Sequence, residues 1–129
     1  MHQRPDPLDL LDAVAGFLRE QALPQLPPIA AYHARVAANA LDIVRRQLQL
    51  APEAETAELR RLRALLQRDG SLDQLNRLLC ERIASGDMGF DTPDLLQHLW
   101  QTTLDKLAVD QPGYDSFRRE SAADLGTRA

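Results

Sequence analysis

The sequence predicts an all-α protein, a single compact up-and-down bundle of about five helices. Three observations predict it. Apolar residues recur with a spacing near 3.6 in five segments, and no segment alternates with the period of two that is typical of strands. Capping residues and prolines separate these segments at short intervals. A chain of 129 residues is also long enough for one hydrophobic core and too short for two.

The first two predicted helices lie on either side of a proline-rich elbow. Asp6 supplies a side-chain acceptor for a helix that begins at Pro7, the residue best suited to the first helical position, and ends near residue 23. Residues 24–28 contain three prolines and are expected to form an ordered connection. The second helix covers residues 29–50 and is expected to be interrupted at Pro52.

Three further helices follow. The third covers residues 53–67, with glutamates in its first turns and arginines after them, an order that suits the helix dipole. Ser71 and Gln74 have the spacing of a capping box and open a fourth helix through residue 83. Thr92 and Pro93 open a fifth, which residues 111–113 end. The inner faces are expected to be Leu72, Leu75, Leu79 and Ile83 on the fourth helix, and Leu96, Leu99, Trp100, Thr103, Leu104 and Leu107 on the fifth.

The domain organisation follows from composition. Residues 1–114 are expected to form the helical bundle domain. Residues 115–129 are polar and charged with few large apolar side chains, and are expected to form a flexible C-terminal tail.

Charge and composition restrict the classes of partner. The formal net charge is −4, so there is no basic surface of the kind that binds nucleic acid. No apolar run approaches the roughly 20 residues that cross a bilayer, and the start of the chain lacks the features of a signal peptide. We therefore expect a cytoplasmic protein with no nucleic-acid or membrane partner. Cys80 is the only cysteine, which excludes an intramolecular disulfide, and it is expected to be buried as a small apolar residue.

The segment 29–50 has the most unusual composition. Its apolar residues fall on one side of a helical wheel, which predicts a helix at the centre of the bundle. His33 and Gln47 lie inside this apolar sector. His33 is the best candidate for acid–base chemistry, and the alternative is a core histidine bonded to a carbonyl or carboxylate. The apolar set is Ile29, Tyr32, Val36, Ala40, Ile43 and Val44.

Arg35 and Asn39 lie one turn apart on the same side of this helix. An arginine offers a bidentate contact and an asparagine an added donor, so the pair is a candidate site for a carboxylate or phosphate. The alternative is structural: Arg35 pairs with a carboxylate of a neighbouring helix and Asn39 caps a loop. His33 and, from the fourth helix, Asn76 complete the candidate ligand site. No catalytic, phosphate-binding or metal-binding motif is present, so we expect no catalytic residue, metal or cofactor.

Three segments resemble an uncharacterised bacterial family of small helical domains, which is known only as a domain of unknown function. They are residues 32–39 (YHARVAAN), residues 75–83, which contain LN at 75–76 and LCERI at 79–83, and residues 102–112 (TTLDKLAVDQP). The resemblance spans about residues 5–114. Members of that family are encoded beside kinase-like phosphotransferases of the aminoglycoside-phosphotransferase type and acyl-CoA dehydrogenases, which implies an accessory role with such an enzyme as partner.

Two functional hypotheses follow. The first is a non-enzymatic helical accessory or interaction module, a partner of a phosphotransferase-fold enzyme in acyl-CoA or small-molecule catabolism. The second is a small-molecule binding protein with a site for an anionic ligand near Arg35 and Asn39. A homodimer formed through an apolar strip is compatible with either.

Overall fold

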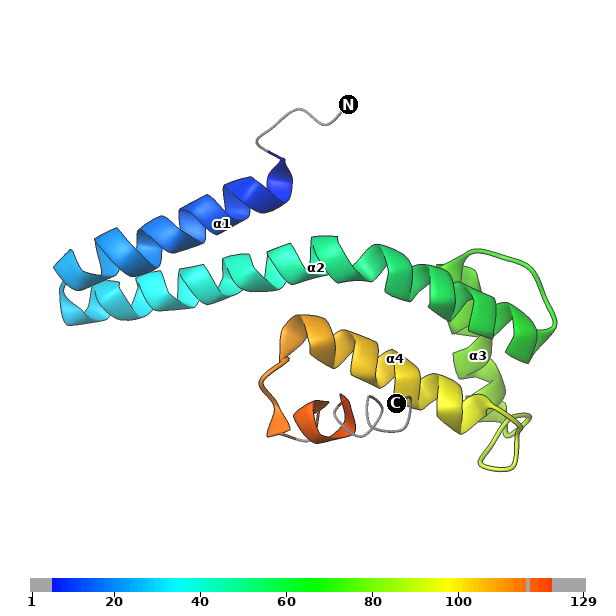
Figure 1. Ribbon diagram of the computed structural model, residues 1–129. Coiled ribbons are helices and arrows are strands. Elements are labelled where there is room, and N and C mark those ends of the chain that lie inside the picture. Colours follow the sequence, from blue (N-terminus) through cyan, green and yellow to red (C-terminus); the bar gives the residue numbers. More distant parts are fainter. Residues whose placement is uncertain (1–5, 116, 122–129) are drawn as a thin grey trace. The chain divides into compact units, whose positions relative to one another are not determined.

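The computed structural model describes residues 6–115 and 117–121. These residues contain helices and turns and no strand, which confirms the all-α class. The principal elements are α1 (Pro7–Phe17), α2 (Pro28–Leu66), α3 (Leu72–Ser85) and α4 (Leu95–Asp110), shown in Figure 1. The chain divides into two compact units, Met1–Leu50 and Ala51–Ala129, called here unit 1 and unit 2, and each is described by itself.

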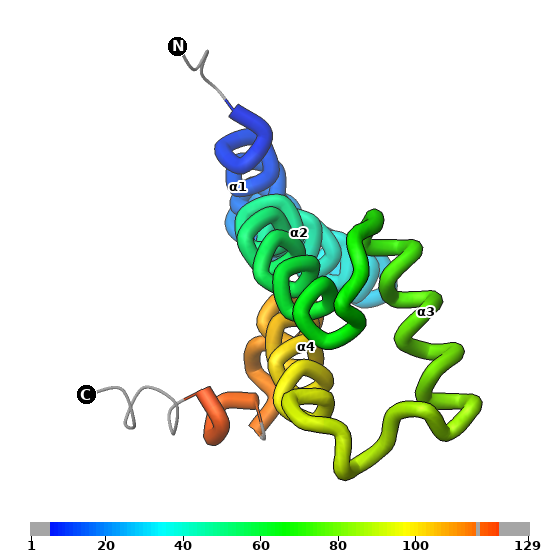
Figure 2. Tube along the Cα trace, turned by 90° about the vertical axis from the view of Figure 1, so that its right-hand side faces the viewer, coloured from blue at the N-terminus to red at the C-terminus, as the bar shows by residue number. Residues whose placement is uncertain are grey.

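Unit 1 is a helical hairpin. The side chain of Asp6 accepts a hydrogen bond from the amide of Asp9 and caps α1, with Pro7 in the first turn as predicted. A π-helical turn, η1 (Leu18–Ala22), and a 3₁₀ turn, η2 (Leu23–Gln25), then lead into α2. Figures 1 and 2 show α1 alongside the first half of α2. The proline-rich elbow is therefore a sharp, ordered reversal.

Small side chains form the contact surface of this hairpin. The buried residues of unit 1 are Ala15 of α1 and Ala34 and Ala38 of α2. Alanines allow two helix backbones to approach closely, but each buries little apolar area. Two ion pairs flank the alanines: Arg45 lies 3.2 Å from Asp12, and Arg19 lies 2.6 Å from Asp42.

The apolar face predicted to make this part of α2 central is exposed. The prediction of burial was wrong because α2 turns its alanine side, on the opposite side of the helix, toward α1. His33 and Gln47 are exposed as well, so the interpretation of His33 as a core histidine was also wrong. The exposed residues of the predicted face are Ile29, Tyr32, Val36, Ala40, Ile43 and Val44.

α2 also continues through Pro52, where the sequence predicted an interruption. A proline inside a helix removes one backbone hydrogen bond and crowds the preceding turn, but it does not always end the helix. Here the hydroxyl of Thr56 donates to the Pro52 carbonyl at 2.9 Å. The predicted second and third helices are thus one helix, which ends where Gln67 adopts a φ of 51°.

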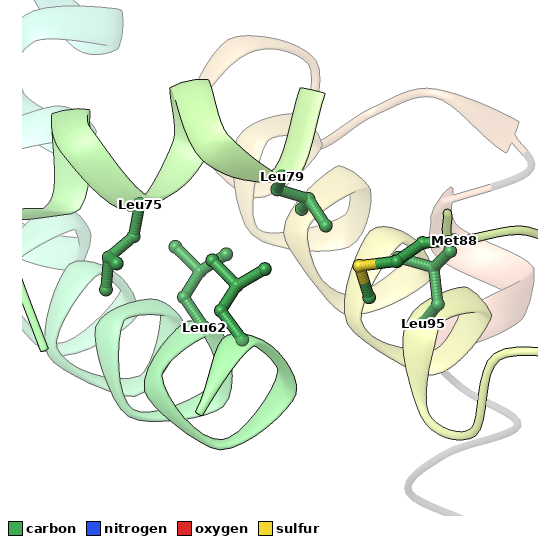
Figure 3. Packing of buried hydrophobic residues seen from close by; sticks show 6 residues of the cluster. Leu62, Leu75, Leu79, Met88 and Leu95 are labelled. Atoms are coloured by element: carbon green, nitrogen blue, oxygen red, sulfur yellow. The ribbon is translucent and has the colours of Figure 1, made fainter. Parts of the chain in front are cut away.

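Unit 2 contains a leucine-rich core. Leu75 and Leu79 of α3 face Leu62 of α2, as Figure 3 shows. α3 begins with the predicted capping box, in which Ser71 and Gln74 each bond the other's backbone amide, and ends at Gly86 with a φ of 86°. Ile83, predicted on the inner face of this helix, is exposed instead. The core cluster consists of Leu62, Leu66, Leu75, Leu79, Met88 and Leu95.

α4 begins two residues later than predicted, at Leu95 and not at Pro93. The Thr92 hydroxyl accepts a hydrogen bond from the Gly89 amide at 2.9 Å, so it orders the preceding loop and does not cap the helix. Asp94, with a φ of 69°, stands at the N-cap position. The buried face of α4 also differs from the prediction, because Leu96, Leu99 and Trp100 are exposed. The buried residues are Leu95, His98, Leu104 and Val109.

The predicted tail is helical where the structure describes it. Asp115 and residues 117–121 have helical backbone, and the Arg118 amide donates to the Tyr114 carbonyl at 3.0 Å. The remainder of the predicted tail, residues 116 and 122–129, lies outside the described residues.

Candidate functional site

Unit 2 contains a polar cluster between α2 and α4, in which His98 is buried and its two partners are half-buried. Arg61 of α2 donates from Nε to Nδ1 of His98 at 3.0 Å and from Nη2 to the hydroxyl of Thr102 at 3.2 Å. His98 is 2% exposed and is the buried polar residue of the described part of the chain. His98 and Thr102 lie four residues apart and therefore share one side of α4. One guanidinium thus binds two side chains of the neighbouring helix.

The protonation state of His98 follows from its surroundings. Burial, together with the positive charge of Arg61, lowers the pKa of His98 below its ordinary value, and Glu58 opposes this more weakly. Because Nδ1 accepts from Arg61, the neutral ring carries its proton on Nε2. A neutral imidazole whose basic nitrogen is occupied by a guanidinium is suited to holding α2 and α4 together.

Asn76, one of the four sequence-predicted site residues, lies in the same unit. Its carboxamide nitrogen lies 3.4 Å from a carboxylate oxygen of Glu58, to which it donates, and this contact joins α3 to α2. Glu58 also lies near enough to His98 to influence its pKa. The polar groups of unit 2 therefore include a set of side chains from all three helices: Glu58, Arg61, Asn76, His98 and Thr102.

The other three predicted site residues lie on the first half of α2, in unit 1. Asn39 accepts a hydrogen bond at 2.9 Å from Arg19, whose guanidinium also donates to Asp42 at 2.6 Å. Bonding to Arg19 lowers the pKa of Asp42, and the same bond raises the pKa of Arg19. The side-chain oxygen of Asn39 is thus used within unit 1.

Arg35 and His33 do not share a direction. Each residue of an α-helix turns by about 100°, so two positions two residues apart point to nearly opposite sides. Both residues are exposed. His33 makes an edge-on ring contact with Tyr32, with ring centroids 5.5 Å apart. Arg35 and Asn39 remain on one side of the helix, and binding of a ligand there stays a prediction.

An exposed apolar surface lies on α4. Its residues are spaced by three or four positions, so they form one continuous strip, named here the α4 strip. Trp100, predicted as a core residue, is 48% exposed in this strip. The strip lines a shallow depression together with Gln97; its residues are Leu96, Leu99, Trp100 and Thr103.

Two other sequence expectations concern reactive or metal-binding groups. Cys80 is exposed and was predicted to be buried. It lies next to Leu79 on α3 but on the side away from the leucine core, because adjacent helical residues diverge by about 100°. Among the described residues, no group of three or more histidine, cysteine or acidic side chains is placed to hold a metal ion.

Sequence reasoning missed the Arg61–His98–Thr102 cluster. The available signal was the spacing of His98 and Thr102 with Leu95, three and four residues apart on one face of α4. The partner that completes the cluster, Arg61, is 37 residues away from His98 in the chain, and no local pattern indicates it.

Comparison with known protein families identifies the family of this chain. Residues 24–114 match the model described as Domain of unknown function (DUF6285). The chain belongs to this family. The DUF6285 match contains α2, α3 and α4, hence both the polar cluster and the α4 strip, and it begins after α1. No curated protein and no solved structure matches the chain.

The DUF6285 match agrees with the resemblance to a family of unknown function that the sequence segments indicated. It assigns no chemistry to any residue. Nothing in the described part of the chain has both the length and the apolar character of a membrane-spanning helix.

Proposed function

We propose that this DUF6285 protein is a non-enzymatic accessory module that binds another protein through the α4 strip. The observation that carries the proposal is the exposure of Trp100 beside Leu96 and Leu99 on one face of a helix. Tryptophan is enriched among the residues that dominate protein–protein binding energies. Apolar anchors spaced by three and four residues on a helix are also typical of helix-in-groove recognition.

The resemblance found in the sequence directs the choice of partner. Because relatives of the resembled bacterial family are encoded beside aminoglycoside-phosphotransferase-like kinases and acyl-CoA dehydrogenases, we propose an enzyme of one of these two classes, with the phosphotransferase-fold enzyme first. The module would then act in acyl-CoA or small-molecule catabolism in the cytoplasm. It would supply a binding surface and leave the chemistry to its partner.

The test is affinity capture of the full-length chain from a lysate of its source organism, with mass spectrometry of the bound proteins. We expect a phosphotransferase-fold enzyme or an acyl-CoA dehydrogenase in stoichiometric amount. Trp100→Ala should abolish the capture, because it removes the largest anchor of the strip. Ile83→Ala, which truncates an exposed apolar side chain of α3, is the matched control and should retain it. Recovery of the chain without either enzyme contradicts the proposal.

A second candidate function is binding of an anionic small molecule near Arg35 and Asn39. The observation that favours it is that Arg35 is exposed and has no ion-pair partner among the described residues. A guanidinium in this state is available to a carboxylate or phosphate. His33 also belonged to the predicted site, but it points to nearly the opposite side of α2 from Arg35. Asn76, the fourth predicted residue, belongs to unit 2.

Thermal-shift measurements with a panel of carboxylates and phosphate esters test this second function. A ligand that binds the folded protein raises its melting temperature. Arg35→Ala should remove that increase and leave the far-UV circular dichroism spectrum unchanged. An increase that survives the substitution would place the ligand elsewhere.

A further inference from the structure

The side of α2 that faces away from α1 carries a regular apolar pattern in unit 1. Four apolar residues recur at intervals of seven, and all are exposed. We name them the heptad stripe. Residues seven positions apart lie on nearly the same side of an α-helix, so these four form one stripe along it. The stripe consists of Ile29, Val36, Ile43 and Leu50, which are 76%, 48%, 38% and 39% exposed.

The hairpin of unit 1 does not cover this stripe. Ala34 and Ala38 are the buried residues of this stretch of α2, and Val36 lies about 200° around the helix from Ala38. The side chains that unit 1 does bury are alanines, which contribute little apolar area. Apart from the half-buried Leu41, the larger apolar side chains of this part of α2 are exposed.

We propose that two copies of the chain associate through the heptad stripe, with their α2 helices antiparallel. The spacing of the stripe fits such a pair. Ile29 and Leu50 are equally distant along the helix from the midpoint between Asn39 and Ala40, and so are Val36 and Ile43. A two-fold axis at that midpoint brings Ile29 of each copy level with Leu50 of the other. One surface is then its own complement, as an isologous interface requires.

The size and the charge of the heptad stripe are compatible with binding of a second copy of the chain. Ile29 and Leu50 are 21 positions apart, which is about 32 Å at the rise of an α-helix. Three neighbouring apolar residues of the same helix, Tyr32, Val44 and Leu48, are also exposed and widen it. The seven side chains form a patch of several hundred Å², approaching the roughly 800 Å² that each partner buries in a standard interface. None of them is charged, so a second copy brings no like charges together.

A small residue lies where the two helices would cross. Ala40 is exposed and adjoins the midpoint of the stripe. Its methyl group allows the two backbones to approach closely, while the larger residues on either side of it interdigitate. This interface uses unit 1 and is separate from the α4 strip of the proposed function. An experiment that contradicts dimerisation through the heptad stripe therefore does not contradict partner binding through the α4 strip.

The first test is the molar mass of the full chain in solution, measured by light scattering or sedimentation equilibrium over a range of concentrations. We expect a species of twice the 14.4 kDa chain mass. Val36→Glu should return the protein to the monomer, because it places two carboxylates in an apolar interface. Ile83→Glu introduces the same charge at a similarly exposed site on α3, 40% exposed, and should stay dimeric. A monomer at every concentration, or a dimer unaffected by Val36→Glu, overturns the proposal.

Disulfide trapping tests the orientation in a protein whose only cysteine, Cys80, is replaced by serine. With the axis beside Ala40, Ala40→Cys places two thiols close together across the interface and should give a covalent dimer on mild oxidation. Ile29→Cys places its two thiols about 32 Å apart along the helices and should give none. Parallel helices in register would bring both pairs of thiols together, so trapping through Ile29→Cys as well as through Ala40→Cys overturns the antiparallel arrangement. Trapping at neither site overturns the interface.

Discussion

His98 links the stability of unit 2 to pH through a single proton. Its folded-state pKa lies below the ordinary value of 6.5, because the ring is buried and lies beside the positive charge of Arg61. The unfolded chain therefore binds this proton more readily than the folded one. By linkage, the stabilisation is complete above about pH 6.5 and is lost progressively as the pH falls below it.

We predict that the urea concentration at the midpoint of unfolding decreases when the pH is lowered from 8 to 5.5. The decrease should be smaller in the His98→Gln variant. Glutamine keeps an acceptor for Arg61 but does not titrate. The carboxylates of the chain contribute the same background slope in both proteins, so the difference between the two pH profiles isolates His98. Parallel profiles would show that His98 does not carry the effect.

Local polar contacts were predictable from the sequence, and distant ones were not. The capping residues Asp6 and Ser71 bond backbone amides three residues ahead, so their spacing alone indicated them. Arg61 and His98 are separated by 37 residues, and Asn39 receives its bond from Arg19, 20 residues earlier. Such pairs depend on which helix faces become neighbours. A single helix pattern does not contain that information.

At the scale of elements, Pro52 interrupts the backbone hydrogen bonding inside a continuous helix, α2. Its ring removes the amide that would bond the Leu48 carbonyl and crowds that turn. Pro52→Ala should therefore stabilise the protein by about 1–3 kcal/mol, since the helix is already formed on both sides of the site. Urea titration followed by circular dichroism measures the change. A lower midpoint in the variant would mean that the proline stabilises α2 in its present conformation.

The choice of buried face was the main error of the sequence analysis. The helical wheel identified the side with the larger apolar residues on both α2 and α4; the structure exposes that side on the first half of α2, and on α4 it exposes Leu96, Leu99 and Trp100 but buries Leu104. In unit 1 the alanine side makes the hairpin contact, because small residues allow the closest approach of two helices. Periodicity thus identified the helical segments, although it divided α2 into two helices at Pro52. The positions of large apolar residues did not indicate which side of a helix is buried.

The leucine core of unit 2 gives the matching mutational prediction. Leu75 is almost fully buried against Leu62 and Leu79, whereas Leu99 of α4 is exposed. Leu75→Ala should lower the free energy of unfolding by about 2–5 kcal/mol, because it removes buried methyl groups and leaves a cavity. Leu99→Ala should change it by less than about 1 kcal/mol. Comparable losses for the two variants in urea titration would contradict the assignment of the core.

At the scale of the whole molecule, the two units have different means of stabilisation. Unit 2 has a cluster of six buried apolar residues from two helices, the loop between α3 and α4, and the first residue of α4. Among the described residues of unit 1 the three buried ones are alanines, several leucines are half-buried, and the apolar residues of the heptad stripe are exposed. A hairpin of this size with so little buried area is marginal by itself. Its stability should therefore depend on what covers the heptad stripe.

Hydrogen exchange measured at several protein concentrations should reveal this dependence. If a second copy covers the stripe, amide protection in α1 and residues 28–50 of α2 rises with concentration, because dimerisation stabilises only the associated form. Protection in α3 should stay constant, since its core lies within unit 2. Val36→Glu should remove the concentration dependence, and the Ile83→Glu control should keep it. Strong protection of unit 1 in a monomeric sample would instead mean that the hairpin is stable without a second copy, and that the exposed stripe has another purpose.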